Sequence, residues 1–69
     1  MKFNFITNVD RELYIKLRNA VFYALKEKGI KNELWSYDDG FEIKSYYDNS
    51  IIKDIVLKAS KGWLICTIK

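Results

Sequence analysis

Histidine and proline are absent from this chain of 69 residues, and cysteine occurs once. Without histidine the commonest general base of enzymes is missing, and neither a Cys–His nor a Ser–His nucleophile pair can form. The single Cys66 cannot close an internal disulfide, and it cannot supply the roughly four ligands of a closed zinc site. The sequence therefore predicts a protein that is not an enzyme and that uses no cofactor and no metal.

Glycine and long apolar runs are also scarce. The three glycines are spread along the chain, so they cannot form the glycine-rich loop that binds phosphate groups. No stretch approaches the roughly eighteen apolar residues of a membrane-spanning helix. The segment Met1–Ile6 is too short and too interrupted for a signal peptide. We therefore expect a cytoplasmic protein with no membrane partner, in which Cys66 is a buried thiol.

The residues that are present suffice for one folded domain. Apolar residues make up 49% of the sequence and aromatic residues 16%, which argues against intrinsic disorder. We expect residues 1–69 to form a single domain, with some aromatic side chains at the surface because so small a core cannot hold them all. The formal net charge of +3 permits binding to nucleic acid without requiring it.

The N-terminal half of the chain predicts one strand followed by one long helix. Lys2–Ile6 is typical of a strand. The helix is predicted over Asn8–Lys28, with Thr7 or Asn8 as its N-cap and Gly29 as the left-handed residue that ends it. At about 100° per residue, its core face collects five apolar residues, which are Leu13, Leu17, Ala20, Val21 and Ala24.

The opposite side of the same helix carries a second line of residues, and this line is the first candidate for a binding surface. Its members are four, three, four and four residues apart, and they are Arg11, Ile15, Arg18, Phe22 and Lys26. A helix that packs on one sheet needs only its core face buried. Three interpretations are open: a solvated face covered by arginine and lysine stems, a protein interface, or contact with nucleic-acid phosphates.

A hairpin is predicted between the strands Glu33–Tyr37 and Phe41–Tyr47, and its register affects function. With Asp39-Gly40 as a two-residue turn, Trp35 and Tyr37 share a face with polar residues of the second strand and form an open aromatic platform. With a three-residue loop and a glycine bulge, the apolar residues fall on one face instead. We favour this second register because the hydrophobic pattern sets strand register. It predicts core packing for Trp35, Tyr37, Phe41, Ile43 and Tyr47.

The C-terminal part is ambiguous between strand and helix. Ile51–Ala59 has the apolar spacing of a helix except at Leu57, but it is rich in β-branched residues and precedes Ser60-Lys61-Gly62, which is typical of a hairpin loop. We predict a strand here, paired with a last strand Trp63–Ile68 that is central in the sheet or covered by a partner.

The predicted fold is α+β, with a long helix packed on an antiparallel sheet in the order β-α-β-β-β-β. If Ile51–Ala59 is helical, the order becomes β-α-β-β-α-β, a ferredoxin-like pattern. That second helix would then be able to cover Phe22 from within the chain.

Three acidic residues near the predicted turns are the remaining candidates for chemistry. Asp38, Asp39 and Asp48 have the side chains of a divalent-cation site or of an acid–base pair. Aspartate is also expected in turns for backbone reasons, and the spacing is not that of an EF-hand loop. We interpret them as turn residues.

These observations predict a small non-enzymatic protein-binding module that acts by occluding a surface of its partner. In size, composition and lack of catalytic groups the chain resembles the small inhibitors that phages and plasmids use against host machinery, such as anti-CRISPR proteins. A homodimer is an alternative assembly, and weak nucleic-acid binding through the same helix face is the alternative function. The predicted binding residues are Arg11, Ile15, Arg18, Phe22, Tyr23, Lys26 and Tyr46.

Overall fold

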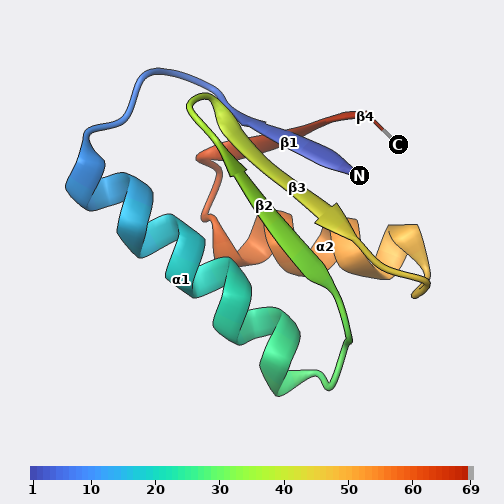
Figure 1. The fold of residues 1–69 in the computed structure, drawn as a ribbon. Helices are drawn as coiled ribbons and strands as arrows, with labels where there is room; N and C mark the ends of the chain where they lie inside the picture. Colours follow the sequence, from blue (N-terminus) through green and yellow to red (C-terminus); the bar gives the residue numbers. More distant parts are fainter. Residues whose placement is uncertain (69) are drawn as a thin grey trace.

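Within residues 1–68, which the computed structural model describes, the chain forms two helices and a four-stranded antiparallel sheet (Figure 1). The α+β class and the alternative order β-α-β-β-α-β are confirmed, whereas the favoured order β-α-β-β-β-β is wrong. Along the chain the elements are β1 (Lys2–Phe5), α1 (Arg11–Glu27), β2 (Glu33–Tyr37), β3 (Gly40–Lys44), α2 (Asn49–Ala59) and β4 (Leu64–Ile68).

The strands lie in the order β2-β3-β1-β4, and each neighbouring pair is antiparallel. Strands β2 and β4 are therefore the edges of the sheet, and the prediction that the last strand is central is wrong. Both helices pack side by side on one face of the sheet (Figure 1), which is the arrangement of a ferredoxin-like domain. Neither helix covers the other face.

The core lies between the sheet and the two helices. Phe3 of β1 and Phe41 of β3 are fully buried, and Phe41 also meets the rings of Phe5 and Tyr14 at centroid distances of 5.4 and 5.2 Å. Leu25 of α1 is fully buried although it lies outside the predicted core face. The other buried hydrophobic residues are Leu17, Val21, Ile30, Ile43, Ile52, Val56 and Leu64.

Helix α1 begins later than predicted because Asp10, and neither Thr7 nor Asn8, is its N-cap. The Asp10 carboxylate accepts a hydrogen bond from the backbone N–H of Leu13 at 2.7 Å. A carboxylate is favourable at this end of a helix, since it also interacts with the positive end of the helix dipole. Gly29, at φ +71°, follows the end of the helix as predicted.

The segment Ile51–Ala59, predicted as a strand, is helical and forms most of α2. Asp48 caps this helix by accepting hydrogen bonds from the N–H and the hydroxyl of Ser50 at 2.8 and 2.6 Å. Ile52 and Val56, one helical turn apart, are buried in the core. Burial of this face outweighs the β propensity of the segment, because that propensity is weak and depends on context.

The register of the β2–β3 hairpin also differs from the favoured one. Tyr37 pairs with Gly40, so that Asp38 and Asp39 form a two-residue turn. Trp35 pairs with Glu42, and residues that pair directly share a face of the sheet.

The prediction of core packing for three aromatic residues is wrong, for two of them because of this register and for Tyr47 because β3 already ends at Lys44. Trp35, Tyr37 and Tyr47 are 49%, 40% and 50% exposed. Leu34 and Ile43 face the helices in this register and take part in the core. Trp35 shares a face with Glu42, as in the open aromatic platform of the alternative register, but the turn is Asp38-Asp39 and not the Asp39-Gly40 turn of that register.

Candidate functional site

The second line of α1 remains at the surface of the folded protein. Ile15 and Phe22 are each 45% exposed. Helix α2 lies along a different side of α1, near Ala24 and Lys28, so the expectation that α2 covers Phe22 is wrong. The five residues of the line are all exposed, and they are here called the outer face of α1: Arg11, Ile15, Arg18, Phe22 and Lys26.

Two hydrogen bonds hold α1 next to the edge strand β2. The hydroxyl of Tyr14 donates to the carbonyl oxygen of Tyr37 at 2.7 Å. The Nε of Arg18 donates to the hydroxyl oxygen of Ser36 at 3.1 Å. These bonds place the outer face of α1 beside the edge of the sheet and hold the Arg18 guanidinium one helical turn from Phe22.

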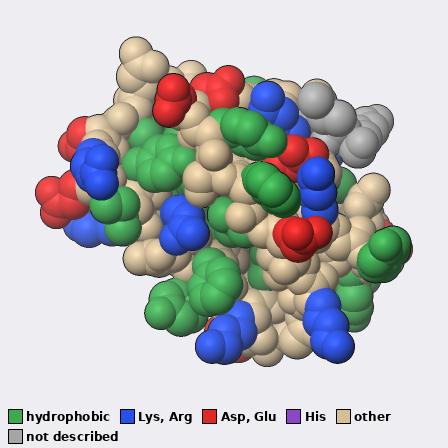
Figure 2. Space-filling view, in the orientation of Figure 1, with side chains coloured by type: hydrophobic (Ala, Val, Ile, Leu, Met, Phe, Trp, Pro, Cys, Tyr) green, Lys and Arg blue, Asp and Glu red, His purple; other side chains and the backbone are tan. Residues whose placement is uncertain are grey.

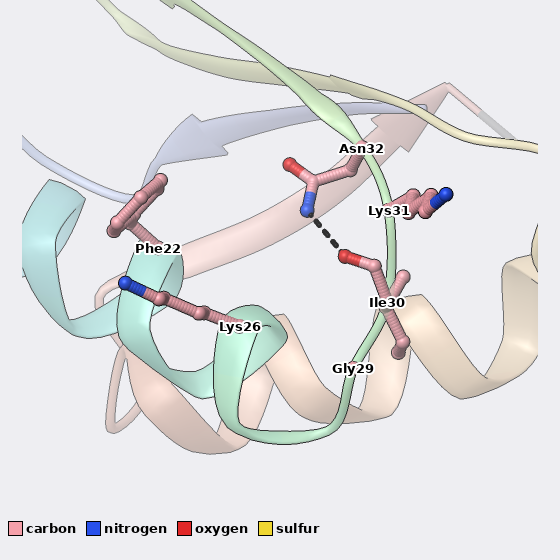
Figure 3. Close-up of a pocket in the computed structure, with 6 residues that line it drawn as sticks. All are labelled: Phe22, Lys26, Gly29, Ile30, Lys31 and Asn32. Atoms are coloured by element: carbon pink, nitrogen blue, oxygen red, sulfur yellow. Dashed lines mark hydrogen bonds between the residues drawn. The ribbon is translucent and has the colours of Figure 1, made fainter.

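A hollow of about 380 Å³ lies beside Phe22 (Figure 3). Phe22 and Lys26 approach it from α1, and Asn32 approaches it from the segment that leads into β2. The Asn32 side chain donates from Nδ2 to the carbonyl oxygen of Ile30 at 2.9 Å, which fixes this wall. Two lysines and no acidic residue line the hollow, and its lining consists of Phe22, Lys26, Gly29, Ile30, Lys31 and Asn32.

The hollow extends the predicted site by residues that the sequence did not point to. Spacing along one helix identifies the members of a helix face, but Lys31 and Asn32 reach this face only because the chain turns back at Gly29. The only feature of the sequence that could have pointed to these residues is the loop after Gly29, which contains Lys31. The sequence of this loop does not indicate against which side of the helix it packs.

Two predicted residues lie beyond the outer face. Tyr23 is 62% exposed and meets Phe22 edge-to-face, with ring centroids 5.5 Å apart, so it belongs to the same surface. Tyr46 is fully exposed, as predicted, and lies between β3 and α2. It lines a second hollow together with Met1 and Asn49, and the structure does not bring it together with Phe22.

The uncovered face of the sheet is an aromatic platform that the favoured register did not predict. The ammonium of Lys44 lies 5.2 Å from the centroid of the Trp35 ring, and that of Lys2 lies 5.1 Å from the centroid of the Tyr37 ring. Both are cation–π contacts. The sequence feature that indicates this face is the alternation of the polar Glu42 and Lys44 with the buried Phe41 and Ile43 along β3.

Charges on this platform are balanced. The Tyr37 hydroxyl donates to a Glu42 carboxylate oxygen at 2.9 Å. This hydrogen bond, with smaller contributions from burial and from the Glu42 charge, raises the pKa of Tyr37 above its ordinary value of 10.0. Lys2 and Lys44 are thus accompanied by Glu42 and Glu33, the residue that pairs with Lys44. The platform therefore gives no electrostatic preference for an anion. On the outer face of α1, the hollow beside Phe22 is lined by lysines alone among charged residues, whereas Asp10 and Asp38 lie beside Arg11 and Ile15.

Within residues 1–68, no three histidine, cysteine or carboxylate side chains are grouped so that they could hold a metal ion. The structure places Asp38 and Asp39 in the hairpin turn and Asp48 at the start of α2. In the same part of the chain, no helix has the length and apolar character needed to cross a membrane.

No protein-family model, curated protein or solved structure matches this chain.

Proposed function

We propose that this chain is a small non-enzymatic protein-binding module whose binding surface is the outer face of α1. The observation that supports this most directly is that Ile15 and Phe22 stay 45% exposed while the rest of the chain packs elsewhere. Exposed apolar side chains grouped on one face are typical of interaction sites. Burying each of them on binding would contribute at most about 1.5 to 3 kcal/mol.

The charges of this surface indicate the kind of partner. Arg11, Arg18 and Lys26 flank the apolar pair, and all have the same sign. An acidic protein surface with an apolar centre is complementary to this pattern, and such complementarity accelerates association and selects the partner. Arg18 is already held by Ser36, so less side-chain freedom is lost on binding.

Binding of this kind would be sufficient for an inhibitor that occludes a functional surface of a host protein, as the small inhibitors of phages and plasmids do. The platform on the sheet and Tyr46 lie outside the proposed contact. In this proposal, Phe22 and Ile15 are the desolvated anchors, and the cations orient the complex.

The proposal is tested by capture of partners from an extract of the organism in which the chain occurs. The comparison uses the wild type, Phe22→Asp and Ile51→Asp. Ile51 is a matched control, since it is also 45% exposed but lies on α2. We expect a protein that is retained by the wild type and by Ile51→Asp and is lost with Phe22→Asp. Equal retention by all three folded variants would contradict the proposal.

Weak nucleic-acid binding through the same face is the second candidate, and the three cations of the line favour it. It predicts that the affinity for a DNA duplex falls with salt with a logarithmic slope of about −0.9 per phosphate contacted. Fluorescence anisotropy with a labelled duplex at several salt concentrations measures this slope. Absence of binding at low salt would eliminate this candidate.

A further inference from the structure

The backbone directions in β3 show which groups of β2 are free for pairing. The N–H of Ile43 donates to the carbonyl of Met1 at 2.8 Å, and its carbonyl accepts from the Met1 amino group at 2.9 Å. Ile43 therefore points its backbone groups away from β2. Successive residues of a strand direct their backbone N–H and C=O groups to opposite sides of the strand. Glu42 therefore directs these groups toward β2, where it pairs with Trp35.

Leu34 and Ser36 flank Trp35, so by the same alternation they direct their N–H and C=O groups away from β3. Because β2 is an edge of the sheet, these four groups face outward. Such an edge is a template for a further strand. The side chains of Leu34 and Ser36 lie on the helix side, where Ser36 binds Arg18.

Strand β2 has few of the features that usually block strand addition, and its one charged residue is Glu33 at its start. Residues Glu33–Tyr37 contain no proline and no lysine, and the pairing of β2 with β3 is regular along its length. The pair at the opposite side of the sheet differs, since β1 and β4 shift register between Lys2 and Phe3. Bulges, prolines and lysines are the common protections of edge strands.

We propose that β2 accepts an extended acidic segment of the partner as a fifth strand, an inference that rests on the proposed function of the outer face of α1. Two residues of the segment would pair with Leu34 and Ser36 and form four backbone hydrogen bonds. Their side chains would point to the helix side, because directly paired residues share a face. There they meet Arg18, and at the Leu34 end they approach the hollow beside Phe22 and Lys26.

Charge selects an acidic segment over a second copy of this chain. Two copies joined through their β2 edges would bring two outer faces of α1 together, each with Arg11, Arg18 and Lys26. Like charges placed opposite one another are unfavourable across an interface. Carboxylates on the helix side of an added strand pair with these cations instead, while the alternate residues contact Trp35 on the uncovered face of the sheet.

The test uses a synthetic ten-residue peptide with blocked ends, in which glutamate alternates with valine. A matched peptide with lysine in place of glutamate is the control. Amide hydrogen exchange, followed by NMR on the full chain, reports on individual residues. In the free protein we expect rapid exchange at Leu34 and Ser36 and slower exchange at Trp35. On saturation with the glutamate peptide, exchange at Leu34 and Ser36 slows at least about tenfold, and the lysine peptide binds at least about tenfold more weakly.

A substitution in β2 provides an independent test. Ser36→Pro removes the outward N–H, and Ser36→Ala keeps it while removing the same bond to Arg18. We expect the glutamate peptide to bind Ser36→Pro about tenfold more weakly than Ser36→Ala. If Ser36→Pro does not fold, the exchange measurement on the wild type decides alone.

The outcomes separate this inference from the proposed function. Chemical-shift changes at Ile15 and Phe22 without slower exchange at Leu34 and Ser36 would overturn strand addition and leave the outer face of α1 as the site. If the peptide slows exchange at β2 and Phe22→Asp binds the peptide as tightly as the wild type does, strand addition would be supported and the proposed function contradicted. The inference would be overturned if the glutamate peptide did not bind at millimolar concentration. It would also be overturned if exchange at Leu34 and Ser36 were equally slow without peptide because two copies of the chain form a dimer.

Discussion

Neighbouring residues of α1 have opposite environments, since consecutive side chains of a helix point about 100° apart. Val21 is 0% exposed, and Phe22 is 45% exposed. Phe22 contacts Tyr23 and lines the hollow, whereas Val21 belongs to the core cluster that contains Leu25 and Phe41. At the scale of single residues, one position separates a side chain that stabilises the fold from one that is available to a partner.

This difference predicts the effect of two adjacent substitutions. Phe22→Asp should lower the free energy of unfolding by about 1 kcal/mol or less, because the removed ring is half exposed. Val21→Asp should prevent folding, because it buries a carboxylate that has no partner. Urea denaturation followed by tryptophan fluorescence measures both. Similar losses for the two variants would show that Phe22 belongs to the core.

The two helices differ in how far the sequence determined them. For α1, the 3.6-residue spacing identified the exposed outer face and part of the core face, but it missed the buried Leu25, and the N-cap was misplaced. For α2, the spacing of Ile52 and Val56 competed with a high content of β-branched residues, and local preferences were nearly balanced. The decision came from burial against α1 and from the Asp48 cap, both of which depend on the folded chain.

The register of the β2–β3 hairpin could not be predicted from the sequence either. Apolar residues on both sides of β2 allowed two registers, and the favoured one was wrong because Leu34, Phe41 and Ile43 already supply the core side. The observed turn, Asp38-Asp39, belongs to neither predicted register. The position of Ile15 and Phe22 on the side of α1 opposite its core face was predictable from spacing alone. The hollow and the outward groups of β2 were not, since they arise where α1, the loop after Gly29 and β2 meet.

The cap of α2 predicts a specific dependence of stability on pH. Hydrogen bonds from the hydroxyl and the N–H of Ser50 lower the pKa of Asp48 below its ordinary value of 3.8. The carboxylate therefore stabilises the folded state above about pH 3.8, and this contribution is lost as the pH falls through the lower pKa of the folded state.

We expect the urea midpoint of Asp48→Ala to lie below that of the wild type from pH 7 to about pH 5, with the gap narrowing toward pH 3. Asp48→Asn is the matched control, because asparagine also caps helices but carries no charge. The difference in urea midpoint between Asp48→Asn and the wild type should also become smaller toward pH 3. A gap for Asp48→Ala that stays constant down to pH 2 would show that the charge of Asp48 does not contribute.

On the scale of the whole molecule, β2 separates two surfaces of different character. Figure 2 shows hydrophobic side chains interspersed with both basic and acidic ones on the face that carries α1 and β2. On the sheet side, Lys2 and Lys44 are balanced by Glu33 and Glu42. The charged residues of the outer face of α1 are all basic, although Asp10 and Asp38 lie beside its Arg11 end. The side that borders the outward groups of β2 therefore combines exposed apolar side chains with cations at its Arg18 and Lys26 end.

We propose that the outer face of α1 is open in the free protein and binds a different, acidic partner. Sedimentation equilibrium of the wild type and of Phe22→Asp, at low and at high salt, tests it most directly. We expect the mass of the 8.2 kDa monomer for both proteins at both salt concentrations, with Phe22→Asp still folded. A wild-type dimer that Phe22→Asp converts into a folded monomer would contradict it, because a second copy of the chain would then occupy this face.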